Sequence, residues 1–392
     1  MTKQRSLLRA GRPRAAPLEE RLEALRAADW NFRAAKTQKG VHRIHPYPAK
    51  FIPHIPRRLI ELLHPGDGSA VLDPFCGSGT ALVEAQALGY PAIGIDLNPL
   101  AALIARVKTH PPGVSLLPSV AGVVARARRT VDKVPPIPRL DHWFEPAVQE
   151  ALSALVGAIE VVPDARVREA LQVALSSIIV RVSNQESDTR YAAIQKPALG
   201  KESVLDAFRR AAEDLERAFI EQYGSSRPGD LRDVQVLARD TLHVKPGELK
   251  GPVGMAVTSP PYPNAYEYWL YHKYRMYWLG MDPITVREQE IGARPHFFKK
   301  NAHTAEDFGR QMSTVFALIS RVLVPGGLAC FVVGRSIIRG REVDNGALLA
   351  QAASKHGFRA LADVVRAIPG TRKAFNPVHG TITRETIVVF GR

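Results

Sequence analysis

The sequence contains only two cysteines, Cys76 and Cys330, in 392 residues. A disulfide framework is therefore excluded, and we expect a reducing, cytoplasmic compartment. No apolar run reaches the ~18 residues that a membrane-spanning helix needs. No apolar stretch follows the N-terminal charges, as one would in a signal peptide. With 45% hydrophobic and 23% charged residues, the chain has the composition of a globular protein that buries a core.

Acidic residues are scarce at the start of the chain. Residues 1–60 hold 14 Lys/Arg against four Asp/Glu, a surplus of +10 within a formal net charge of +15. Such a surplus favours a polyanionic partner, because each cation placed on a phosphate releases condensed counterions. A solvated basic tail explains the charge equally well. The charge also does not distinguish DNA from RNA.

The pattern of apolar residues divides the chain into three parts. Residues 1–40 are basic and are expected to be weakly ordered apart from a short amphipathic helix over 18–30. Residues 41–110 together with 231–392 hold the predicted strands, which are 70–74, 91–96, 233–238, 253–258, 328–334, 358–366 and 385–390. Residues 111–230 are expected to be a helical insertion without strands. Helices are predicted at 56–63, 80–88, 305–323, and near 147–182 and 201–222.

The segment "DPFCGSGT" (73–80) joins a predicted strand to a predicted helix. Gly77 and Gly79 allow a tight turn and the close approach of a ligand. The helix presents its N-terminal N–H groups to that ligand. Asp96 follows Asp73 by 23 residues, at the end of the next strand, where a carboxylate can accept hydrogen bonds from both ribose hydroxyls of a nucleoside. The loop lacks G-x-G-x-x-G and a P-loop lysine, which argues against a dinucleotide or a triphosphate.

A second motif, Ser259-Pro260-Pro261-Tyr262, follows an apolar strand that ends at Thr258. The prolines fix φ and lack N–H donors, so the Ser259 oxygen and the Pro260 carbonyl are left as acceptors for an exocyclic amine of a base. Two such hydrogen bonds free the nitrogen lone pair for in-line attack on a methyl group, largely through positioning. Tyr262 can stack on a flipped base. Alone, the tetrapeptide is more often a turn, but its place after a buried strand favours catalysis.

The segments "DPFCGSGT", "GIDLNP" and "SPPY" together resemble the motifs of the N6/N4 amino-methyltransferases, and are most similar to the cytosine-N4-specific DNA enzymes. The segment "HRIHPYPAKF" (42–51) resembles the motif that precedes their glycine loop. The resemblance implies an α/β class I methyltransferase fold, Rossmann-like, with a seven-stranded sheet, a final antiparallel hairpin and a helical insertion. It also implies S-adenosyl-methionine as the cofactor.

Carried over residue by residue, the resemblance implies specific roles. Lys50 and Phe51 would line the methionine pocket, Asp96 would bind the ribose, and Asp240 would bind the adenine amino group. The full set of expected cofactor-binding residues is Lys50, Phe51, Asp73, Pro74, Phe75, Gly77, Ser78, Gly79, Thr80, Asp96, Asn98, Asp240 and Thr258. The expected catalytic residues are Ser259, Pro260, Pro261 and Tyr262.

Candidate substrate contacts lie in three further places. These are Tyr266, then Asn184 and Arg190 in "VSNQESDTRY", and Arg372, Lys373 and Phe375 in the basic loop before the last strand. Both loops are also readily explained as solvated surface. No metal is expected, since no cysteine or acidic residue completes a ligand shell around His42, His45 and His54. Cys76 is expected to pack rather than to act as a nucleophile.

These motifs predict methylation of cytosine N4 in double-stranded DNA at a specific sequence, with residues 111–230 as the target-recognition region. Adenine N6 and an RNA base amino group remain as alternatives with the same chemistry. A cytosine-C5 enzyme needs a Pro-Cys nucleophile, and neither cysteine provides one. A DNA-binding module without activity would predict degenerate motifs, whereas both are intact. No membrane partner is expected, and a cognate restriction nuclease and the oligomeric state stay open.

Overall fold

The computed structural model describes residues 16–392 except for 34, 49, 131, 189, 225–227, 264–266, 298–301, 339–340 and 369–382. Three of the candidate substrate residues, Arg372, Lys373 and Phe375, and also Tyr266, therefore lie outside the described residues. The strongly basic stretch 1–15 also lies outside them.

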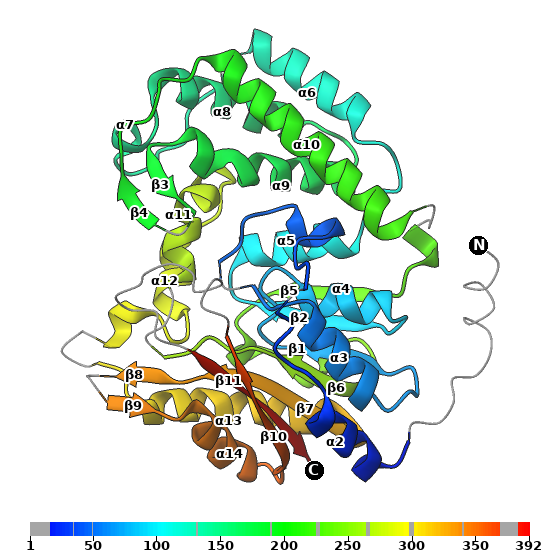
Figure 1. Ribbon diagram of the computed structural model, residues 1–392. Helices are drawn as coiled ribbons and strands as arrows, with labels where there is room; N and C mark the ends of the chain where they lie inside the picture. The colour runs from blue at the N-terminus through cyan, green and yellow to red at the C-terminus, as the bar shows by residue number, and fades with distance from the viewer. Residues whose placement is uncertain are drawn as a thin grey trace.

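A seven-stranded sheet in the order β10-β11-β7-β6-β1-β2-β5 forms the centre of the fold (Figure 1). Its strands are β1 (Ala70–Asp73), β2 (Ala92–Asp96), β5 (Val234–Ala238), β6 (Val253–Thr258), β7 (Leu323–Gly334), β10 (Arg359–Ala367) and β11 (Arg384–Gly391). Strands β5, β2, β1, β6 and β7 are parallel, whereas β11 is antiparallel to both β7 and β10. The predicted α/β class I methyltransferase fold, with seven strands and a final antiparallel hairpin, is confirmed.

Alternate residues of the central strands face two different helical layers. Val71 packs in one core with Leu59, and Leu72 packs in the other core with Phe316. This alternation follows from the period of two along a strand, and burial on both faces explains the continuous apolar runs. The first layer contains α2 (Leu18–Ala27), α3 (His54–Leu63) and α4 (Thr80–Ala87), and the second contains α13 (Ala305–Val322) and α14 (Asn345–Ser354). Thr304 and Asp307 form a capping box that begins α13, as the S/T-x-x-D/E pattern favours.

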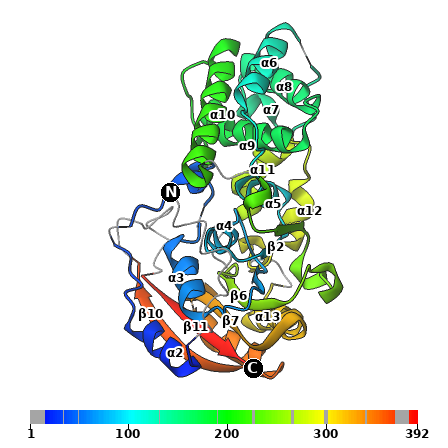
Figure 2. The ribbon, with the colours of Figure 1, turned by 90° about the vertical axis from the view of Figure 1, so that its right-hand side faces the viewer.

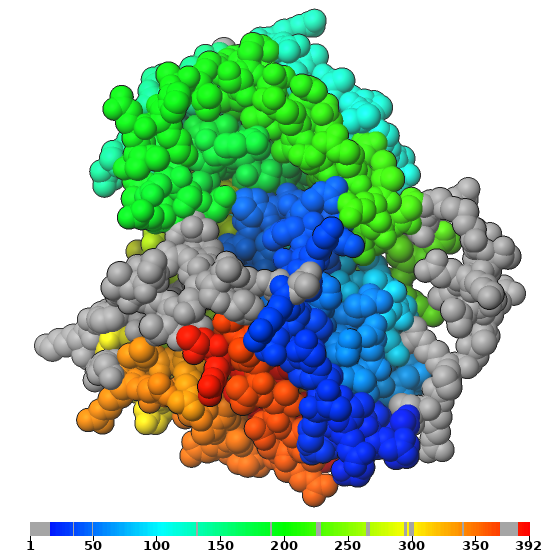
Figure 3. Space-filling model, in the orientation of Figure 1, coloured from blue at the N-terminus to red at the C-terminus, as the bar shows by residue number. Residues whose placement is uncertain are grey.

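A third core joins the insertion to the sheet domain. It includes Leu103 of α5, Leu152, Leu171 and Phe208 of the insertion, and Trp278. The helices involved are α5 (Pro99–Thr109), α6 (Leu117–Arg129), α7 (Leu140–Trp143), α8 (Pro146–Glu160), α9 (Ala165–Val182), α10 (Lys201–Tyr223) and α11 (Tyr268–Trp278). Figure 2 shows α6, α8, α9 and α10 stacked beyond one edge of the sheet, and Figure 3 shows the surface of the insertion at one end of the molecule.

The insertion departs from prediction in three respects. The pattern near 147–182 forms two helices, because Pro163 interrupts the run and Asp164 accepts hydrogen bonds from Arg166 and Val167 as the cap of α9. The proline-rich stretch after residue 111 contains α6, whose Pro118 lies in the first turn, where a missing N–H costs nothing. The expectation of no strands is wrong, since β3 (Gln185–Ser187) and β4 (Arg190–Ala193) form an antiparallel hairpin.

One further difference lies outside the insertion. A small antiparallel pair, β8 (Ser336–Ile338) and β9 (Arg341–Val343), was not predicted. The short amphipathic helix expected over residues 18–30 is α2, which buries Leu22 and Leu25 and packs on α3. A further helix, α12 (Pro283–Gln289), follows α11. Within the described part of the chain, no helix has the length and apolarity to cross a membrane.

Candidate functional site

The glycine loop after β1 folds around Asp96. Gly77 has φ +49° and Gly79 has φ +78°, both in the left-handed region that favours glycine. The Gly77 N–H donates to Asp96 Oδ2 over 2.8 Å, and the Asn98 N–H donates to Asp96 Oδ1 over 2.8 Å. The loop and the end of β2 are thus held together by the carboxylate that was predicted to bind a ribose.

The Ser-Pro-Pro-Tyr segment begins where β6 ends, beside β1 in the sheet. Thr258, the last residue of β6, donates its hydroxyl to Asp73 Oδ1 over 2.6 Å. This bond joins the start of the glycine loop directly to the start of the tetrapeptide. The Tyr262 hydroxyl lies 3.4 Å from Ser259 Oγ and donates to the Val332 carbonyl over 3.3 Å. Tyr262 is thus fixed against β7 and lies beside Ser259.

One cleft brings both motifs together. The empty space in it is about 880 Å³, including open solvent at its mouth. The predicted residues that line it are Lys50, Phe51, Asp73, Phe75, Gly77, Ser78, Thr80, Asp96, Asn98, Asp240, Ser259 and Pro261. Its other walls come from Tyr47, Cys76, Leu97, Thr241, Tyr268, Val286, Gln289, Glu290 and Ile291.

The other predicted residues do not line the cleft but lie next to residues that do; they are Pro74, Gly79, Thr258, Pro260 and Tyr262. The Pro74 carbonyl accepts a hydrogen bond from the Thr241 hydroxyl over 2.5 Å. A Cβ on Gly79 would lie 2.9 Å from Ala105 Cα, so this glycine permits close packing of the loop on α5. Pro260, Thr258 and Tyr262 belong to the strand end and tetrapeptide described above, but do not line the cleft.

Two carboxyl groups in the cleft are held by neighbouring donors. Burial raises the pKa of Asp73 to about 7, although hydrogen bonds from Thr258 and Phe75 oppose that shift. Burial also raises the pKa of Asp96 to about 6, against the donors of Asn98 and Gly77. Asp96 therefore carries its charge at neutral pH. Asp240 accepts from the Leu242 N–H over 3.0 Å and lies 2.8 Å from His243 Nδ1.

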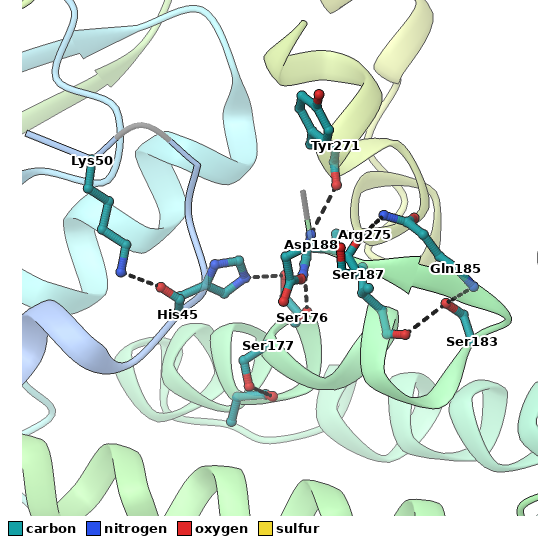
Figure 4. Close-up of polar contacts among 12 residues, drawn as sticks. His45, Lys50, Ser176, Ser177, Ser183, Gln185, Ser187, Asp188, Tyr271 and Arg275 are labelled. Atoms are coloured by element: carbon teal, nitrogen blue, oxygen red, sulfur yellow. Dashed lines mark hydrogen bonds and ion pairs between the residues drawn. The ribbon is translucent and has the colours of Figure 1, made fainter. Parts of the chain in front are cut away.

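The segment preceding the glycine loop forms the opposite wall. Lys50 Nζ donates to the carbonyls of His42 and His45 over 3.0 and 2.7 Å. His42 pairs with Glu84 over 2.8 Å, and His45 Nε2 lies 3.0 Å from Ser176 Oγ. Both imidazoles thus have structural partners. Figure 4 shows Lys50, His45 and Ser176 joined in series between the cleft and the insertion.

Cys76 is buried, and its Sγ and Cβ lie close to Gly94, where an added Cβ would be 2.9 and 3.0 Å from them. Burial raises the pKa of its thiol well above the usual range, so the sulfur stays protonated. A protonated thiol is a poor nucleophile, and the contacts agree with the expectation that Cys76 packs.

Among the cleft residues outside the predicted set, Tyr47, Tyr268 and Glu290 make specific contacts. Tyr47 stacks on Tyr268 with ring centroids 6.0 Å apart and covers Gly77. Glu290 accepts hydrogen bonds from the backbone N–H groups of Tyr268 and Trp269 over 2.8 and 3.3 Å. Burial raises its pKa to about 8. Tyr47 lies within the quoted "HRIHPYPAKF" motif, whereas no local pattern distinguishes Glu290 from a surface glutamate.

The two described candidates for substrate contact lie away from the cleft lining. The Asn184 side-chain amide lies 3.4 Å from the His142 carbonyl and 3.4 Å from Glu145 Oε1. Arg190 starts β4 with 70% of its side chain exposed and pairs with Glu186 over 2.9 Å. Both belong to the β3–β4 hairpin region, on the surface of the insertion.

Comparison with known proteins supports the resemblance seen in the motifs. Residues 14–106 match the N6_N4_Mtase family model, described as DNA methylase. The matched segment includes the motif around Lys50, the glycine loop and Asp96. Residues 14–106 therefore match the N6/N4 amino-methyltransferase family, which supports the resemblance seen in the sequence motifs.

The chain is also similar to three curated proteins. It is 26% identical over 249 residues to the Type II methyltransferase M.MvaI of Kocuria varians, covering 59% of this chain and 55% of the relative. It is 24% identical over 303 residues to M.BsoBI of Geobacillus stearothermophilus, covering 66% and 56%. A shorter match of 70 residues, 47% identical, is to M.MjaII of Methanocaldococcus jannaschii, covering 18% and 13%. The chain spans about half the length, or less, of the curated relatives it matches.

Proposed function

We propose that this chain transfers the methyl group of S-adenosyl-methionine to N4 of cytosine in double-stranded DNA at a specific sequence, by base flipping and direct in-line transfer. The observation that carries this proposal is the shared cleft, which is lined both by Asp96 and Gly77 and by Ser259 and Pro261. A cofactor and a flipped base would meet in that cleft.

The cofactor assignment is supported by the donors and acceptors on the cleft wall. Each oxygen of Asp96 accepts one backbone N–H. Each oxygen keeps a further lone pair, which is available to a ribose hydroxyl. The buried Asn98 side chain accepts from the Leu100 N–H, but its Nδ2 has no hydrogen-bond partner among the described residues. A buried donor without a partner is costly, and a polar ligand in the cleft would satisfy it. When bound, S-adenosyl-methionine supplies an electrophilic sulfonium methyl group.

In the proposed reaction, the Ser259 oxygen and the Pro260 carbonyl accept the two N–H groups of the target amine. This orients the amine nitrogen toward the methyl group, and Tyr262 contacts the face of the flipped base. The hydrogen bond of Tyr262 to Val332 of β7 supports this role, because it holds the end of the tetrapeptide in one position without a ligand. Such preorganisation lowers the entropic cost of reaching the attack geometry.

Residues 111–230 are proposed to read the target sequence, with the basic N-terminal segment and Arg190 contacting DNA phosphates. The exposed arginines at the end of α6 and on the β3–β4 hairpin support this assignment. Exchange of the insertion with that of a relative tests it. The chimera is expected to methylate the relative's site, and retention of the original site would contradict the assignment.

The target atom is tested by incubating the purified protein with DNA and S-adenosyl-methionine, then digesting the DNA to nucleosides for mass spectrometry. N4-methyldeoxycytidine is expected, since a serine begins the tetrapeptide and in the family this residue accompanies cytosine more often than adenine. If methyl groups were found on deoxyadenosine alone, the target would be adenine N6 and not cytosine N4. Transfer to RNA with none to DNA would contradict the DNA assignment.

A further inference from the structure

The Tyr262 hydroxyl lies at a junction of three hydrogen-bonding groups. Its oxygen is 3.4 Å from Ser259 Oγ, 3.3 Å from the Val332 carbonyl oxygen and 3.5 Å from Glu385 Oε1. A phenol carries a single hydrogen to donate, whereas its oxygen can also accept. Burial raises the pKa of Tyr262 well above its ordinary value, so the hydroxyl keeps this hydrogen at neutral pH. The direction of the hydrogen therefore decides what the Tyr262 oxygen can accept from Ser259.

Two acceptors for that hydrogen lie on neighbouring strands of the sheet. Val332 belongs to β7, and Glu385 belongs to β11, where it pairs in register with Gly334 of β7. Of the two acceptors the carboxylate is the stronger, because a charged acceptor forms a stronger hydrogen bond than a neutral carbonyl. A hydrogen that points to these strands leaves the Tyr262 oxygen to accept a hydrogen bond from the Ser259 hydroxyl.

The direction of the Ser259 hydroxyl matters because its oxygen is the proposed acceptor for the target amine. Ser259 lines the cleft, whereas Tyr262 does not. A hydroxyl has one hydrogen and two lone pairs. If Ser259 donates its hydrogen to Tyr262, both lone pairs remain for the amine. If Tyr262 donated to Ser259 instead, one lone pair would be occupied, and the serine hydrogen could point at the hydrogens of the amine.

Glu385 is itself held in place by Arg366. The two residues lie directly opposite each other in the β10–β11 pair, so their side chains share one face of the sheet. Arg366 donates to Glu385 Oε2, and its Nε donates to the Trp30 carbonyl over 3.0 Å. The Arg366 side chain is 2% exposed and that of Glu385 is 19% exposed. The ion pair thus occupies one carboxylate oxygen and leaves Oε1 for the Tyr262 hydroxyl.

Resting on the proposed reaction, we infer that Glu385 is a positioning residue for methyl transfer. Its carboxylate draws the Tyr262 hydrogen toward β11, the Tyr262 oxygen accepts the Ser259 hydrogen, and the Ser259 lone pairs turn to the target amine. Glu385 does not line the cleft. It therefore acts on the amine only through Tyr262 and Ser259, and its effect on the reaction depends on the Tyr262 hydroxyl.

The test is a double-variant cycle of Glu385→Gln and Tyr262→Phe. Glutamine keeps the shape of Glu385 without its charge, and phenylalanine keeps the ring of Tyr262 without its hydroxyl. Each single variant is expected to lower the single-turnover rate of methyl transfer to DNA about 3- to 10-fold, as for one weakened hydrogen bond. The double variant is expected to be no slower than Tyr262→Phe alone, because the two residues act as one unit. The KM for DNA and the affinity for S-adenosyl-homocysteine are expected to change less than about twofold.

The matched control is Glu342→Gln. Glu342 also pairs with an arginine, Arg335, but their side chains are 57% and 67% exposed, and neither residue lines the cleft. Its transfer rate is expected to equal that of the unaltered protein. Thermal melts report whether each variant folds. If Glu385→Gln does not fold, Glu385→Asp takes its place in the cycle, since aspartate keeps the charge beside Arg366 but is one methylene shorter.

Two results would overturn the inference and leave the proposed function standing. One is an unchanged transfer rate in the folded Glu385 variant. The other is a loss in the double variant equal to the product of the two single losses, because an ion pair with a structural role alone would act whether or not Tyr262 has its hydroxyl. Absence of methyl transfer by the unaltered protein would instead overturn the proposed function, and the inference with it.

Discussion

Arg275 and Asp188 form an ion pair that joins α11 to the turn of the β3–β4 hairpin (Figure 4). The Arg275 side chain is only 1% exposed, whereas that of Asp188 is 36% exposed. Arg275 also donates to the carbonyls of Ser176 and Tyr271, each over 3.0 Å. One buried guanidinium thus ties the hairpin of the insertion to α9 and to the helix that follows the tetrapeptide.

Asp188→Asn is expected to lower the free energy of unfolding by about 1–3 kcal/mol, because it removes the one acidic partner that a buried guanidinium has among the described residues. The partial exposure of Asp188 keeps the loss below that of a fully buried pair. The measurement is the urea midpoint of unfolding. Glu186→Gln in the same hairpin is the control, since its partner Arg190 is 70% exposed and such pairs contribute about 0–1 kcal/mol. Equal midpoints for the two variants would contradict the prediction.

The sheet could be predicted from sequence because its strands are buried on both faces. Runs such as those around Val71 and Val257 are continuously apolar, and all seven predicted strands coincide with observed ones to within a few residues, apart from the earlier start of β7. The β3–β4 hairpin could not be predicted. Its residues are polar, its strands are three and four residues long, and its stability depends on the tertiary pair of Asp188 with Arg275.

The site was predictable only where one local motif contains the chemistry. Asp96 and Ser259 belong to such motifs, and the sheet brings them to one cleft. Glu290 lies outside both motifs, and only its burial beside the cleft distinguishes it. Burial of a charged residue depends on the packing of distant helices, which local periodicity does not report.

Gly77 and Gly79 are expected to differ when each is replaced by alanine. A Cβ on Gly79 would lie 2.8 Å from the Cβ and 2.9 Å from the Cα of Ala105, whereas a Cβ on Gly77 would meet only the Tyr47 ring at 3.5 Å. Both variants incur left-handed strain, but Gly79→Ala also overpacks the loop against α5, at about 1–3 kcal/mol. Thermal melts are expected to show the larger loss for Gly79→Ala. A larger loss for Gly77→Ala would show that α5 yields to the added methyl group.

Pro260→Ala/Tyr262→Ala is expected to abolish most methyl transfer while cofactor binding survives. The substitutions remove the rigid backbone and the ring that position the amine, but neither residue lines the cleft beside Asp96. Single-turnover transfer to DNA and calorimetry with S-adenosyl-homocysteine measure the two properties separately. Near-normal transfer in the folded double variant would refute the catalytic role, and lost binding would place these residues in the cofactor site.

Cofactor affinity is expected to fall as the pH is lowered through about 6. Burial raises the pKa of Asp96 to about 6, so its carboxylate is ionised above this pH and protonated below it. Ribose hydroxyls donate to the ionised form, and protonation weakens that acceptor. Calorimetry with S-adenosyl-homocysteine between about pH 5 and pH 7 suits this test, because the ligand's own carboxyl group titrates below this range and its amine above it.

Asp96→Asn separates this carboxylate from other groups that titrate nearby. The amide keeps the size of the side chain but cannot ionise, so we expect affinity about 10- to 100-fold lower at pH 7 and little change down to pH 5. Asp73→Asn is the matched variant, because burial also raises the pKa of Asp73, to about 7, while its hydrogen bond comes from Thr258. In Asp73→Asn, cofactor affinity is still expected to fall as the pH is lowered through about 6. If Asp96→Asn kept the fall and Asp73→Asn lost it, Asp73 would be the titrating group, and the ribose would not depend on the charge of Asp96.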